Sequence, residues 1–260
     1  LLGQGIELSR QMDAQLCALL VGADVSGHAD LLAAYGADRV IIAEDERLRA
    51  YAAETYRQVV SLALEAERPE VFLLPSTANG RDLAPRIAAR LGLGLTGDCI
   101  GLEVDGEKRL VQYKPAFGGN VVAPILSRTM PQMATVRPGV LTKADPNWSR
   151  TAETQRLEVG TLPEFPKRTV ESYIESGEAG LALDDAEIVV GVGSGIGGPE
   201  NIAYLDPLIK ALNASIAASL PVARSDWLPK QLQVGLTGKT IAPELYIGIG
   251  SSGGFSQVAG

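Results

Sequence analysis

The stretch from Gln233 to Gly254 reads QVGLTGKTIAPELYIGIGSSGG and contains residues typical of a phosphate-binding loop, because Gly238, Lys239 and Thr240 read GKT. A P-loop also has a glycine five positions before the glycine that precedes the lysine, and here that position is Gln233. No helical pattern follows the lysine directly. The spacing therefore excludes a P-loop nucleoside triphosphatase.

The second half of the same stretch could bind an anion in another way. The run ELYIGIG is typical of a short strand, and it leads into the small residues SSGG, which can open a helix. Such a junction directs free backbone N–H groups and the positive end of the helix dipole at an anion. A nucleotide phosphate fits this pattern, although many strand-to-helix junctions bind nothing.

A second glycine-rich segment, GVGSGIGGPEN, has the spacing GxGxxG at Gly193, Gly195 and Gly198. It follows a predicted strand and precedes a predicted helix, as in dinucleotide-binding folds. That fingerprint also has an acidic residue about twenty positions later, and the segment from Asn213 to Ser219 has none. Ordinary NAD binding is therefore disfavoured. Two explanations of the glycines stay open. They could allow the backbone to approach a phosphate closely, or they could form a tight turn that only glycine allows.

The composition excludes several other classes of function. A net charge of -8 argues against nucleic acid or an anionic membrane as the main partner. The only histidine, His28, gives no support for a histidine-based triad or a zinc site. Cys17 and Cys99 have neither metal-ligand spacing nor a disulfide framework, which favours a reducing compartment. No apolar run approaches the roughly 18 residues of a membrane span, so we expect no direct membrane insertion.

Alternating buried-strand and amphipathic patterns predict an α/β protein, and 260 residues are enough for two modest domains or one large one. In the first 95 residues, strands are predicted at 16–22, 39–44 and 71–75, with a helix carrying Leu48 to Ala63 between the second and third. Another helix is predicted over 83–93, with Pro85 in its first turn. These are βαβ units, which build parallel sheets.

Shorter segments follow, at 99–106, 109–119, 121–127 and 132–139, and we predict that all four are antiparallel strands added to the parallel sheet. Residues 144–178 are polar and proline-containing, and they are predicted to form a connection with one edge strand. A second αβ unit begins near Ala186, with strands at 186–190 and 215–220. The chain lacks an initial methionine and ends within a predicted helix, so we expect a fragment.

Several segments of the chain together resemble one known family. The run QLQVGLTGKTIAPELYIGIGSSGG, with GGPEN and AAS before it, is similar to the flavin-binding domain of the electron transfer flavoprotein alpha subunit, or FixB, family. The earlier segments LLPSTANGRDLAPRIAARLGLGLTGDC and PAFGGNVVAPILS resemble the N-terminal domain of the same family. The resemblance covers nearly the whole chain.

This resemblance implies an N-terminal domain, 1–178, with an adenine-nucleotide-hydrolase-like parallel sheet that packs against a beta subunit. It implies a Rossmann-like FAD-binding domain at 179–260 whose C-terminal part is missing. The implied cofactor is FAD. The implied FAD-binding residues are Gly193, Ser194, Gly195, Ser219, Leu220, Gln233, Val234, Gly235, Thr237, Gly238, Lys239, Gly250, Ser251, Ser252, Gly253, Gly254 and Gln257.

Within this set, the resemblance implies distinct roles. Ser219 contacts the FAD phosphates, the turn from Gln233 to Lys239 wraps the isoalloxazine ring, and Thr237 donates a hydrogen bond near flavin N5. The SSGG junction holds the pyrophosphate and ribityl region. An FAD site needs phosphate-facing amides, an apolar slot and such a donor, without acid–base machinery, which agrees with the scarcity of histidine and cysteine.

Four positions depart from the family pattern. Ser194 and Leu220 replace arginines, Leu236 replaces a glutamine, and Gln257 replaces a histidine. The loss of two arginines removes positive charge that favours phosphate and reduced flavin, which predicts a changed potential or weaker FAD affinity. Lys239 or Arg224 could compensate.

Two functional hypotheses follow from the resemblance. In the first, the protein is an FAD-binding electron carrier that accepts electrons from dehydrogenases of the acyl-CoA type, as in fatty acid beta-oxidation. It passes them to a quinone oxidoreductase or another acceptor. In the second, it is a flavin-poor paralogue that serves as a nucleotide-binding or scaffold subunit of a heterodimer. For either, we expect a cytoplasmic location in a bacterium, or the mitochondrial matrix in a eukaryote.

Overall fold

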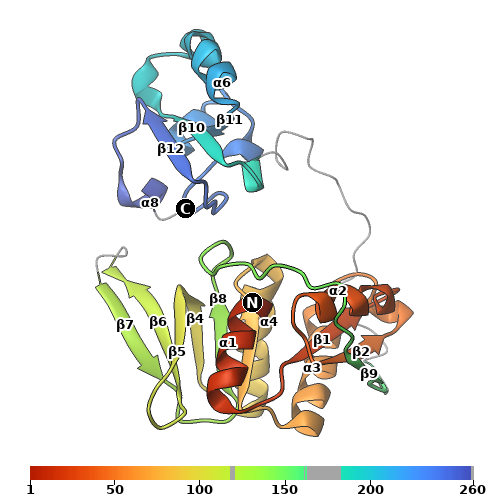
Figure 1. Ribbon diagram of the computed structural model, residues 1–260. Coiled ribbons are helices and arrows are strands. Elements are labelled where there is room, and N and C mark those ends of the chain that lie inside the picture. Colours follow the sequence, from red (N-terminus) through yellow and green to blue (C-terminus); the bar gives the residue numbers. More distant parts are fainter. Residues whose placement is uncertain (118–120, 161, 163–182, 259–260) are drawn as a thin grey trace. The chain divides into compact units, whose positions relative to one another are not determined.

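The computed structural model describes residues 1–117, 121–160, 162 and 183–258. The chain divides into two compact units, Leu1–Ser172 and Tyr173–Gly260, which are coloured red to green and cyan to blue in Figure 1. Each unit is an α/β fold with parallel strands, which confirms the predicted fold class. The predicted boundary between residues 178 and 179 lies outside the described residues.

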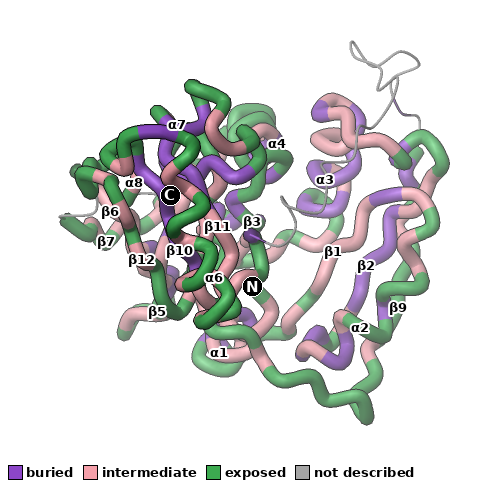
Figure 2. Tube along the Cα trace, turned by 90° about the horizontal axis from the view of Figure 1, so that it is seen from above, coloured by how far each residue is buried: buried purple, intermediate pink, exposed green. Residues whose placement is uncertain are grey.

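Unit 1 begins with helix α1 (Leu2–Met12) and a parallel sheet in the order β1-β2-β9. The strands are β1 (Cys17–Gly22), β2 (Arg39–Glu44) and β9 (Glu153–Arg156), and Cys17 lies opposite Arg39. Figure 2 shows the buried residues of β2, whereas every residue of β9 is exposed, as expected of an edge strand. The connections contain η1 (Ser26–His28), α2 (Ala29–Ala34), η2 (Glu46–Leu48) and α3 (Ala53–Glu67).

A second parallel sheet of unit 1 has the order β3-β8-β4. Its strands are β3 (Val71–Pro75), β8 (Gln132–Val136) and β4 (Leu95–Cys99), and helix α4 (Ala78–Leu91) connects β3 to β4. The prediction of an antiparallel strand at 132–139 is wrong, because β8 runs parallel to both neighbours. Met133 packs with Ile87 of α4, and Ala134 packs with Leu8 of α1, so helices cover both faces and β8 is wholly buried.

The other three segments are antiparallel strands as predicted, but they form a sheet of their own instead of extending the parallel sheet. They form β5 (Gly101–Val104), β6 (Leu110–Ala116) and β7 (Val121–Leu126), a sheet in that order. The prediction for Pro85 is wrong, because α4 begins at Ala78 and the proline lies in its interior. Pro85 lacks the N–H that would bond the carbonyl of Arg81, so the helix has lost one of its hydrogen bonds there.

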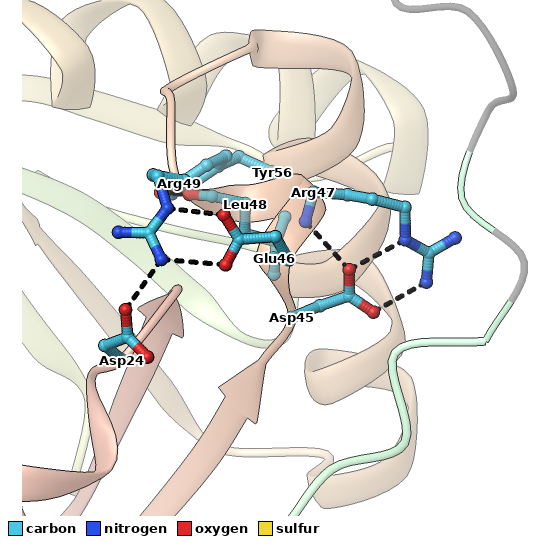
Figure 3. A network of polar contacts seen from close by, with 7 residues as sticks. All are labelled: Asp24, Asp45, Glu46, Arg47, Leu48, Arg49 and Tyr56. Carbon is cyan, nitrogen blue, oxygen red and sulfur yellow. Dashed lines mark hydrogen bonds and ion pairs between the residues drawn. The ribbon is translucent and has the colours of Figure 1, made fainter.

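The acidic residues at the end of β2 form a surface network rather than a helix cap for α3 (Figure 3). Asp45 accepts bonds from the backbone and guanidinium of Arg47, and chiefly the guanidinium bond lowers the pKa of Asp45 to about 2. Arg49 bonds both Glu46 and Asp24. Exposed ion pairs of this kind are screened by water and contribute little to stability.

Unit 2 contains a parallel sheet in the order β11-β10-β12. The strands are β10 (Ile188–Val192), β11 (Ser215–Ala218) and β12 (Leu245–Ile249). The predicted helix after the glycine loop is split into η5 (Pro199–Leu205) and α6 (Asp206–Leu212), and the predicted strand at 215–220 ends at Ala218, where α7 (Leu220–Arg224) takes over. Short helices η4 (Ser194–Ile196), η6 (Lys230–Leu232) and α8 (Phe255–Val258) complete the unit.

The two cysteines differ in exposure, which gives a first testable prediction. Cys17 is exposed, whereas Cys99 is fully buried at the end of β4, and burial raises the pKa of its thiol to about 11. Because thiolate is the reactive form, about one Cys99 in a thousand is ionised at pH 8. We expect a thiol reagent to label one cysteine per native chain and two in denaturant. Rapid labelling of Cys99 in a Cys17→Ser variant of the native protein would contradict this burial.

Candidate functional site

The carboxyl ends of the three strands of unit 2 meet where the strand order reverses. From β10 the chain moves to β11 on one side, and it later returns to β12 on the other side of β10. Ligands of open α/β sheets bind in the crevice outside the carboxyl ends at such a switch point. The segments that follow these ends begin at Gly193, Ser219 and Gly250.

Two of the motif glycines are required by the backbone of the neighbouring strand end. The amides of Gly193 and Gly195 donate to the carbonyls of Ile249 and Gly250 over 2.8 Å. A Cβ atom at residue 193 would lie 2.2 Å from the oxygen of Gly250, and one at residue 195 would lie 2.7 Å from it. Gly250 itself has φ +67°, which favours glycine. This explains Gly193, Gly195 and Gly250 as a tight contact between two loops.

The side chain of Ser219 is buried at the end of β11 and has no hydrogen-bond partner among the described residues. Its amide donates to the carbonyl of Val192 over 2.9 Å, which fixes the backbone at this point. Ser219 precedes the first residue of α7, but its hydroxyl makes no cap bond to that helix. A buried hydroxyl without a partner is unfavourable, so Oγ is suited to a ligand acceptor or donor.

A cavity of about 190 Å³ opens beside this hydroxyl. Nine of the seventeen expected FAD-binding residues line it, together with Pro221 and Ser256, which the resemblance did not indicate. The nine are Ser219, Leu220, Gln233, Val234, Gly235, Thr237, Ser252, Gly254 and Gln257.

The turn from Gln233 to Lys239 closes one side of the cavity through its own hydrogen bonds. The amide of Val234 donates to the carbonyl of Ala218, and the amide of Lys239 donates to the carbonyl of Gln233 over 2.7 Å. The side-chain amide of Gln233 donates to Oγ1 of Thr237 over 2.9 Å. Because this oxygen acts as an acceptor there, the hydroxyl hydrogen of Thr237 is available to a ligand.

The remaining expected residues do not line the cavity. Lys239 forms an ion pair with Asp184, and Gly238 packs against the backbone of Gln233. Ser251 and Gly253 lie in the segment after β12, and no protein oxygen in the described part of the chain accepts a bond from their amides. Ser194 directly follows Gly193 and is the first residue of η4.

The two positions at which the resemblance implies an arginine lie at different places. Leu220 contributes an apolar wall to the cavity, whereas Ser194 does not line it. The two cations that could compensate are not placed to do so. The ion pair with Asp184 offsets the charge of Lys239. Arg224, at the end of α7, does not line the cavity. Gln257 donates to the hydroxyl of Tyr246 over 3.1 Å. The cavity therefore has neutral donors in place of full positive charge.

Two findings on the described residues concern metal ligands and membrane-spanning helices. No group of three or more histidine, cysteine or acidic side chains in the described ranges is arranged to hold a metal ion. Among the helices that the structure describes, none is long and apolar enough to cross a membrane.

The strand order, the glycine turns and the cavity define unit 2 as a Rossmann-like α/β domain. The chain belongs to the electron transfer flavoprotein family. Residues 1–162 match the electron transfer flavoprotein domain, and residues 182–260 match the electron transfer flavoprotein FAD-binding domain.

Three relatives show the extent of the similarity. Electron transfer flavoprotein subunit alpha of Clostridium acetobutylicum is 37% identical over 264 residues, which cover 100% of this chain and 79% of the relative. Protein FixB of Clostridium saccharobutylicum is 37% identical over 100% of this chain and 78% of its own length. Acryloyl-CoA reductase electron transfer subunit beta of Anaerotignum propionicum is 35% identical over 100% of this chain and 79% of its own.

Proposed function

We propose that this protein is the FAD-binding subunit of a heterodimeric electron carrier. The observation that carries the proposal is the buried, unpartnered hydroxyl of Ser219 beside a cavity lined by residues that the family resemblance implies. When bound, FAD supplies the redox chemistry. The residues of this chain bind and orient it, and they need no acid–base group.

The lining residues suit the parts of such a ligand. Ser219 offers a hydroxyl for a phosphate oxygen, and the amides of Ser251 and Gly253 are available at the end of β12. Val234 and Leu220 offer apolar walls for a flat ring. Thr237, held by Gln233, offers one neutral hydrogen-bond donor. A neutral donor stabilises negative charge less than an arginine would.

The partners are part of the proposal. We infer that the protein binds an electron transfer flavoprotein beta subunit through its N-terminal domain, 1–178, and carries FAD in the domain 179–260. Electrons come from a dehydrogenase of the acyl-CoA type and pass to a quinone oxidoreductase or another acceptor. The bacterial origin of the three relatives favours a cytoplasmic location.

The test is an absorbance spectrum of the full-length protein purified with its beta subunit, before and after dithionite. We expect flavin bands at about one FAD per heterodimer that disappear on reduction. A stable but colourless heterodimer that takes up no added FAD would contradict the proposal. It would favour the scaffold function. Two observations support that alternative: Ser194 and Leu220 stand where the resemblance implies arginines, and Lys239 forms an ion pair with Asp184.

A further inference from the structure

Unit 1 contains a cavity of its own, at the carboxyl ends of the parallel strands β3, β8 and β4. Its volume is about 370 Å³, within the range of small-molecule sites, which starts at about 300 Å³. Pro85 of α4 and Leu95 of β4 form apolar walls. None of the residues implied for FAD binding belongs to it, because all of those lie in unit 2.

Four hydrogen-bond donors line this cavity. Arg81 comes from α4 and Lys114 from β6, while Ser76 follows β3 and Thr135 belongs to β8. Among the described residues, Lys114 donates one bond, to the carbonyl of Gly97, and its ammonium group has two further hydrogens for a ligand.

The two hydroxyl groups differ in what they can offer a ligand. Oγ of Ser76 accepts from Arg81 over 3.0 Å, and Oγ1 of Thr135 accepts from the amide of Asp98 over 2.9 Å. The hydroxyl of Ser76 also bonds the carboxylate of Asp98, so its hydrogen is engaged, whereas the hydroxyl hydrogen of Thr135 remains for a ligand. Asp98 occupies the left-handed region at φ 61°, so the backbone bends sharply at the cavity edge.

The charge in this cavity is positive within an acidic protein. Asp98 is the one carboxylate that lines it, and this carboxylate bonds Arg137 over 2.6 Å and Arg81 over 3.2 Å. Burial alone would raise the pKa of Asp98, but the bond and charge of Arg137 and the charge of Arg81 outweigh it and lower the pKa. Within the described residues, no carboxylate forms an ion pair with Lys114.

The neighbouring charges on α4 do not cancel this excess. Asp82 pairs with Arg86 over 2.9 Å and also accepts a bond from Tyr51, so it is engaged away from the cavity lining. Arg81 and Arg137 thus both pair with the one carboxylate that lines the cavity, and Lys114 adds a further positive charge to the lining. The net charge of the whole protein is -8.

We propose that unit 1 binds a small phosphate-bearing molecule in this cavity, with Arg81 and Lys114 supplying the charge and Thr135 supplying a hydroxyl donor. Donors from three side chains match the several oxygens of a phosphate better than the two of a carboxylate. The position at the carboxyl ends of three parallel strands is where α/β folds bind such ligands. The inference is independent of flavin binding in unit 2.

Equilibrium dialysis with radiolabelled inorganic phosphate tests the proposal. The sample is the full-length protein with its beta subunit, saturated with FAD and held at constant ionic strength. We expect Lys114→Met to weaken phosphate binding about tenfold or more, because one charge-assisted contact is lost. Lys108→Met is the matched control, since it removes the same charge from an exposed turn before the same strand.

Further variants and probes separate the outcomes. Arg81→Gln should also weaken binding, but Arg81 bonds Asp98 and Ser76, so Lys114→Met carries the conclusion. Any one of three results would overturn the proposal. These are no phosphate binding, unchanged binding in Lys114→Met, and an equal loss of binding in Lys108→Met. If phosphate binds as expected, a competition experiment identifies the kind of ligand. Phenyl phosphate that displaces the radiolabelled phosphate better than unlabelled phosphate does indicates an organic phosphate monoester, whose organic group contacts Pro85 and Leu95. Equal displacement indicates free phosphate.

Discussion

A Gly193→Ala variant is expected to lose about 3 kcal/mol or more of the free energy of unfolding of unit 2. The backbone of Gly193, at φ -105° and ψ 162°, would accept alanine, so the loss has a purely steric cause. The added Cβ would lie 2.2 Å from the oxygen of Gly250 and 2.5 Å from Cα of Ser251. Backbone atoms cannot rotate away as a flexible side chain can, so the two strand ends must separate.

Urea unfolding followed by the fluorescence of Trp227, which packs against the core of unit 2, measures this loss. Gly254→Ala is the control in the same unit, because its Cβ would meet only Oγ of Ser252, at 3.7 Å. If Gly193→Ala, the control and the parent protein all unfolded at the same urea concentration, the contact between the two loops would not be tight. The explanation of the glycine motif would then fail.

The glycine motif illustrates what the sequence left open. Its spacing fits both phosphate approach and a tight turn. Gly193 and Gly195 are explained by backbone contact with Gly250, which is more than fifty residues away and has no signal in the motif itself. A Cβ at Gly198 would meet only the flexible carboxylate of Glu200.

The fold was predicted well where periodicity was local and poorly where pairing depended on distant segments. The strands at 39–44 and 71–75 end at the predicted residues because apolar runs bounded by polar residues define them. The parallel pairing of β8 was missed because its sequence follows a run of antiparallel strands. Only its burial between α4 and α1 places it in the centre of a parallel sheet.

The lining of the cavity in unit 2 was also predicted only in part. The family resemblance implied nine of its lining residues, whereas Pro221 and Ser256 were missed. Pro221 could have been found from its place one residue after Leu220, and Ser256 from its place beside Gln257. The ion pair of Lys239 with Asp184 had no sequence signal, because 55 residues separate the two.

Replacing Ser219 with alanine is expected to have opposite effects on stability and on FAD affinity. Without FAD, the free energy of unfolding should stay the same or rise by about 1 kcal/mol, because a buried hydroxyl without a partner is removed. The usual loss for a helix-capping serine does not apply, since this side chain makes no cap bond. The affinity for FAD should fall about tenfold or more, because a hydrogen bond to a charged phosphate is lost.

Urea unfolding of the flavin-free heterodimer and titration with FAD measure the two effects in the same variant. Ser225→Ala is the matched control, because this exposed serine ends the same helix, α7, outside the cavity lining. A merely structural hydroxyl would produce the reverse result, with lower stability and unchanged FAD affinity. The opposite signs matter because a variant that is more stable yet binds FAD less tightly cannot owe its weaker binding to misfolding.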